Sequence, residues 1–117
     1  MADRFDIHIE QGATFELEAQ FFDSNKVPRD LTGFVVRMQV RPLADSPYVI
    51  DELTTENGRI ALDNLNAIKL QWTAEQTSRL PSGSHAYDIE LATVGERPER
   101  VERLFEGALF VDREVTR

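Results

Sequence analysis

The side chains with the clearest chemical potential are two pairs of carboxylates. Asp88 and Glu90 lie two residues apart, so an extended chain places both on one face of a strand. Carboxylates separated by roughly 5–9 Å can act as acid and base in glycoside hydrolysis. Glu16 and Glu18 have the same spacing. Strands that show a polar face to water produce this pattern too, so we predict no catalytic residue and keep a small hydrolase using Asp88 and Glu90 as the weakest hypothesis.

The two histidines and the absence of cysteine bear on metal and thiol chemistry. His8 and His85 are far apart in sequence, and neither has a second histidine nearby at ligand spacing. Without cysteine, the chain has no disulfide, cysteine metal site or thiol nucleophile. It also contains no glycine-rich phosphate-binding loop and no Gly-x-Ser-x-Gly motif. We therefore expect solvent-exposed histidines, no metal and no cofactor.

Aromatic side chains offer a different chemistry, because their faces can stack on sugar rings. Trp72 is in phase with Ile68 and Leu70 on an alternating segment, which favours a place in the core. Tyr87 also falls on an apolar phase, so we expect its ring inside and its hydroxyl at the rim. A carbohydrate-binding module that uses Trp72 or Tyr48 is the alternative function.

Period-two alternation of apolar and polar residues dominates the chain and predicts strands. The expected strands cover residues 5–9, 15–21, 34–41, 48–53, 60–62, 68–72, 87–91 and 101–111. Asn57-Gly58 is a strong hairpin signal. Gly107 inside the last strand predicts a bulge that swaps its faces, and the alternative is a strand buried on both sides. One short helix is expected near residues 74–80, with Thr73 as N-cap and Gln76 completing a capping box.

The composition is that of one globular domain. The chain has 117 residues, of which 41% are hydrophobic and 29% are charged, and its net charge is -8. This negative charge argues against non-specific binding to nucleic acid, and the absence of a long apolar run argues against membrane insertion. The sequence therefore predicts an all-β fold, an immunoglobulin-like antiparallel β-sandwich of seven or eight strands over residues 1–117.

The order of several short motifs resembles a known family. The motifs, in chain order, are Ile9-Glu10-Gln11-Gly12-Ala13-Thr14-Phe15, Asp30-Leu31-Thr32-Gly33-Phe34, Met38-Gln39-Val40-Arg41, Leu53-Thr54-Thr55-Glu56-Asn57-Gly58, Tyr87-Asp88-Ile89-Glu90-Leu91, Arg103-Leu104-Phe105-Glu106-Gly107 and Val115-Thr116-Arg117. The series resembles small tail-associated proteins of tailed bacteriophages and prophages, and in outline the N-terminal domain of baseplate upper proteins. The resemblance implies a non-enzymatic virion component that joins the tail hub to fibres or receptor-binding proteins.

This resemblance also implies which surfaces meet other proteins. The partners would be other tail or baseplate proteins, and this chain would form a homo-oligomer or be present in several copies in one particle. Open sheet edges invite strand pairing, and the first and last strands are expected to lie at such edges. The candidate interface residues are Phe5, Ile7, Ile9, Arg37, Arg41, Val115 and Arg117.

Overall fold

The computed structural model describes residues 3–63 and 66–116, apart from the side chain of Asp63. Almost all of its regular structure is β-strand, as predicted. The elements are β1 (Asp3–Arg4), β2 (Ile7–Glu10), β3 (Phe15–Gln20), β4 (Phe34–Arg41), β5 (Asp51–Thr54), β6 (Ile60–Asp63), β7 (Ala67–Trp72), α1 (Ala74–Ser78), β8 (Gly83–Thr93) and β9 (Val101–Asp112).

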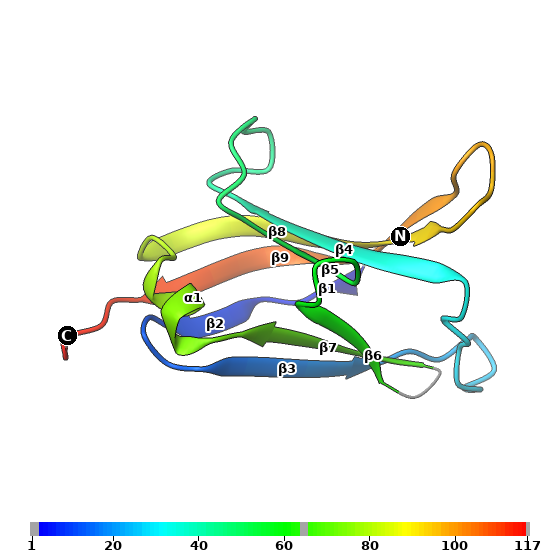
Figure 1. The fold of residues 1–117 in the computed structure, drawn as a ribbon, viewed down its shortest axis with the longest axis horizontal. Coiled ribbons are helices and arrows are strands. Elements are labelled where there is room, and N and C mark those ends of the chain that lie inside the picture. Colours follow the sequence, from blue (N-terminus) through cyan, green and yellow to red (C-terminus); the bar gives the residue numbers. More distant parts are fainter. Residues whose placement is uncertain (1–2, 64–65, 117) are drawn as a thin grey trace.

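The strands form two sheets that pack face to face, which confirms the predicted β-sandwich. The larger sheet has the order β1-β9-β8-β4-β5, with β2 also paired to β9, and the smaller sheet has the order β3-β7-β6 (Figure 1). These orders match the G-F-C-C′ and B-E-D strands of an immunoglobulin variable domain. One detail differs from the prediction, because β1 and β2 run parallel to β9 while the other pairs are antiparallel.

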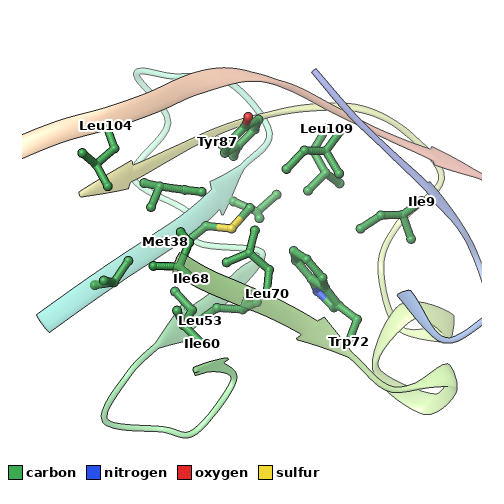
Figure 2. Packing of buried hydrophobic residues seen from close by; sticks show 14 of the residues in the cluster. Ile9, Met38, Leu53, Ile60, Ile68, Leu70, Trp72, Tyr87, Leu104 and Leu109 are labelled. Carbon is green, nitrogen blue, oxygen red and sulfur yellow. The ribbon is translucent and has the colours of Figure 1, made fainter. Parts of the chain in front are cut away.

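The core lies between the inner faces of the two sheets, where the alternating residues point. From the larger sheet, Val36, Met38 and Val40 are fully buried, and Ile68 and Leu70 of the smaller sheet lie opposite (Figure 2). Residues between them on each strand face outwards, as the periodicity predicts. The face of each strand that packs into the core is therefore set by whether its odd-numbered or its even-numbered residues are apolar.

The last strand departs from expectation in two ways. Ile89 pairs with Phe105 while Glu90 pairs with Arg103, so the extra residue of the bulge is Leu104 rather than Gly107. Glycine is required at 107 for a different reason, because an added Cβ would lie 2.3 Å from the carbonyl oxygen of Phe5. The strand is also no edge, since β9 lies between β8 and the β1–β2 segment.

The short helix α1 joins β7 to β8 and holds the turn between β2 and β3. Its capping box is present as predicted, although the helix ends at Ser78, two residues early. The buried Thr77 hydroxyl donates to the Ala13 carbonyl at 2.8 Å and accepts from the Gly12 amide at 3.0 Å. In the part of the chain that the structure describes, no helix is long enough to cross a membrane.

Candidate functional site

A polar groove of about 390 Å³ lies on the outer face of the larger sheet. Two loops project on this side of the molecule, residues 42–50 after β4 and residues 94–100 between β8 and β9 (Figure 1). The floor is built from outward-facing residues of β4, β8 and β9, the parity opposite to the core. The charged residues of the lining are Arg37, Arg41, Glu52, Asp88, Glu90, Arg103 and Glu106.

Sheet register places opposite charges beside one another across this floor. Glu90 lies opposite Arg37 on β4 and opposite Arg103 on β9. The Arg103 guanidinium also contacts Asp88 at 3.4 Å and Glu106 at 3.7 Å. Asp88 and Glu90 therefore do share a face, as predicted, but within a surface of mixed charge.

Two arginines predicted as interface residues hold the projecting loops. Arg37 donates to both carboxylate oxygens of Glu99, at 3.4 and 3.2 Å, which draws the 94–100 loop against β4. This hydrogen bond raises the pKa of Arg37 further above its ordinary value. Arg41 donates to the Ser46 carbonyl at 2.8 Å, which ties the middle of the 42–50 loop to β4, and to Gln39 Oε1 at 2.6 Å.

The 42–50 loop presents apolar side chains to solvent. Leu43 and Tyr48 are 67% and 65% exposed, and Val94 at the start of the other loop is 60% exposed. Exposed apolar side chains around arginines are the composition of a protein contact surface. The sequence analysis had not singled out Leu43 or Val94.

The predicted interface at the first strand needs correction. Ile7 and Ile9 are only 2% and 1% exposed, so their side chains belong to the core and cannot contact a partner. Phe5 is half exposed and lies next to the free edge of the sheet, and Val115 is exposed in the C-terminal tail. Arg117 lies outside the described residues.

Of the two histidines and Trp72, the structure buries His85 and Trp72 and leaves His8 exposed. His8 is exposed and stacks on Phe110, whereas His85 is buried with Nε2 2.7 Å from the Pro81 carbonyl oxygen, against the expectation that it is solvated. Among the described residues, no group of three potential ligands could hold a metal ion. Trp72 is buried, as expected, and offers no face to a sugar, so of the two aromatic residues named for carbohydrate stacking Tyr48 is the one that is exposed.

A half-buried ionic cluster that the sequence analysis missed joins the two sheets along the side where β5 and β6 are the edge strands. Asp51 of β5 accepts two hydrogen bonds from Arg59, at 2.7 and 2.9 Å, and one from Trp72 Nε1 at 3.0 Å. Burial alone would raise the pKa of Asp51, but these hydrogen bonds outweigh it and hold the pKa below its ordinary value. The Arg59 guanidinium also lies 5.9 Å from the centroid of the Trp72 ring.

Comparisons with known proteins add little to this description. No family model matches the chain, and no curated protein matches it. Among solved structures, the endo-β-1,4-mannanase from Thermotoga petrophila is similar to it, with a TM-score of 0.48 and 17% sequence identity. The match covers 92% of this chain and 18% of the mannanase chain, so the chain spans under a fifth of that protein's length. A similarity this weak carries no argument about function.

Proposed function

We propose that this chain is a non-enzymatic adaptor that binds neighbouring proteins through the groove face of its larger sheet. The observation that carries the proposal is the exposed Leu43 and Tyr48 on a loop that Arg41 fixes above the polar groove. Tyrosine and arginine dominate the binding energy of many protein interfaces. A rigid sheet under the loops limits the entropy lost when a partner binds.

The resemblance to tail-associated phage proteins suggests where such an adaptor works. We propose that it is a virion component, present in several copies and placed between the tail hub and fibres or receptor-binding proteins. Mass spectrometry of purified particles from a strain that carries the gene tests this placement. The chain is expected in intact particles, and its absence from them would reject the virion role.

The groove face can be tested separately, by pull-down with the products of neighbouring genes. Tyr48→Ala and Leu43→Ala remove exposed side chains that contribute little to the fold. We expect capture to weaken at least tenfold with each, because exposed apolar anchors lose their contact area. Val27→Ala is the matched control, since Val27 is an exposed apolar residue on the loop between β3 and β4. Equal capture by all three variants would refute the groove as the contact surface.

Carbohydrate binding remains the second candidate because Tyr48 is exposed on the 42–50 loop, and Ala44 of the same loop lines the groove, whose polar groups can bind hydroxyls. A glycan array probed with wild type and Tyr48→Ala separates it from the adaptor role. Specific glycan signals that vanish in the variant would support it, and a blank array would reject it.

A further inference from the structure

The edge of the smaller sheet at β3 is open and is separate from the groove face. Among the residues that the structure describes, β3 pairs with β7 on one side and with no strand on the other. The Phe21 amide donates to the Asn66 carbonyl at 2.8 Å, which extends the β3–β7 register and fixes its phase. Odd-numbered residues of β3 therefore direct their backbone groups towards β7, and Glu16, Glu18 and Gln20 direct theirs to the open edge. An unpaired row of this kind is a template for another strand.

An apolar hollow of about 140 Å³ opens beside this edge. It lies between the sheets, where the β1–β2 segment of one sheet and β3 of the other leave a seam. Its walls include Phe5, Leu17, Ala19, Ile68, Ile89 and Phe105. An apolar hollow of about 150 Å³ is large enough to hold a benzene-sized group. One or two aliphatic side chains would therefore fill it.

The open edge and the hollow are arranged so that one extended segment can use both. Side chains of an added strand alternate between the two faces, as those of β3 do. One set would align with Leu17 and Ala19 and enter the hollow. The other set would stand directly opposite Glu16 and Glu18, within about 5 Å of them. The hollow thus requires apolar residues at every second position, and the outer face favours basic residues between them.

Charge decides between a foreign strand and a second copy of this chain. The outer face of the edge carries Glu16 and Glu18 next to one lysine, Lys69, which pairs with Glu16 at 2.8 Å. If two β3 strands paired antiparallel, the glutamates of one copy would face those of the other, which is destabilising. A partner with lysine or arginine at those positions is favoured instead, and more so because the whole chain carries a net charge of -8.

We propose that β3 accepts an extended segment of another polypeptide by strand addition, with apolar residues in the hollow and basic residues against Glu16 and Glu18. The segment completes the smaller sheet and closes the seam. This inference concerns a different surface from the groove and does not depend on the adaptor proposal.

Fluorescence anisotropy with two labelled eight-residue peptides tests the proposal. In one peptide valine alternates with lysine, and in the other valine alternates with glutamate. We expect the lysine peptide to bind at least tenfold more tightly, with an affinity that falls as salt rises. Equal binding of both peptides, or no binding of either at millimolar concentration, would overturn the proposal.

Two variants locate the binding. Glu18→Pro removes an N–H that points to the open edge and leaves the bonds to β7 intact, because proline is tolerated on edge strands. It should abolish binding of the lysine peptide, with the fold checked by circular dichroism. The double substitution Glu16→Lys and Glu18→Lys keeps every backbone group and should reverse the peptide preference. Unchanged binding in both variants would place the peptide elsewhere. Analytical ultracentrifugation gives the last outcome. If the wild type is a dimer and Glu18→Pro is a monomer, a second copy of this chain occupies the edge and the proposal is refuted.

Discussion

The Asp51–Arg59–Trp72 cluster gives the sharpest test of how this sandwich is held together. Asp51 belongs to an edge strand of the larger sheet, and Arg59 directly precedes an edge strand of the smaller one. Both side chains are 18% exposed, so the ion pair is largely removed from water. Asp51→Ala leaves the Arg59 charge without its carboxylate and removes the acceptor of the Trp72 indole N–H.

The cost follows from these two losses. Breaking a buried ion pair by removing one partner costs about 3–5 kcal/mol, and residual solvent access at this site reduces that figure. An indole N–H left without an acceptor adds about 1–3 kcal/mol, partly relieved by relaxation. We expect Asp51→Ala to lower the free energy of unfolding by about 2–4 kcal/mol, a large share of the 5–15 kcal/mol of a typical domain.

Urea denaturation followed by circular dichroism measures this change. Glu75→Ala is the control, since it removes the exposed ion pair with Arg79 on α1 and should cost under about 0.5 kcal/mol. Asp51→Ala combined with Arg59→Ala should be less destabilising than the sum of the single changes. A loss below about 0.5 kcal/mol for Asp51→Ala, or strict additivity, would refute the reasoning.

The pH dependence of the free energy of unfolding provides a second test of the same cluster. The folded-state pKa of Asp51 lies below its ordinary value, so its stabilisation is present above about pH 4 and is lost as pH falls through the folded-state pKa. The stability gap between wild type and Asp51→Ala should therefore narrow as pH falls below about 4. A gap that is constant to about pH 2 would contradict the proposed role of the charge.

Three further predictions concern contacts that fix the edges. Burial, and then the negative charge of Asp6, raise the pKa of Tyr87 to about 12. The neutral phenol therefore adds about 2–3 kcal/mol to the free energy of unfolding below pH 10, and this contribution should be lost as pH rises towards 12. Tyr87→Phe should abolish this alkaline component in urea denaturation, and an identical pH profile would exclude it. Thr77→Val removes the hydrogen-bond partner of the Gly12 amide and the Ala13 carbonyl. It should lower the free energy of unfolding by about 1–3 kcal/mol in chemical denaturation. An unchanged free energy would mean that the turn between β2 and β3 does not need α1. Gly107→Ala places a Cβ in contact with the Phe5 carbonyl oxygen and should lower the free energy of unfolding by about 1–3 kcal/mol in thermal denaturation. An unchanged melting temperature would show that β1 and β2 can shift to make room.

The residues of the groove show what the local alternation of polar and apolar residues can predict. Arg37 and Asp88 are outward-facing residues of alternating strands, so their exposure on a sheet surface could be predicted. Their proximity could not, because β4 and β8 are distant in sequence and meet only through sheet register. The expectation that His85 is exposed was wrong for a different, local reason: β8 begins at Gly83, so the alternation of the strand places the His85 ring on the same buried side as Tyr87.

The sequence by itself determined the sandwich class, the inward parity of most strands and the capping box of α1, because all of these depend on neighbours within a few residues. Only the tertiary structure decided that the last strand lies inside its sheet, that Gly107 lets the Phe5 carbonyl approach closely and that Asp51 is half-buried against Arg59 and Trp72. These features depend on which strands meet, and strand pairing is set by the packing of both sheets together. The open edge of β3 is of the same kind, since an edge is defined by the absence of a neighbour that local alternation cannot reveal.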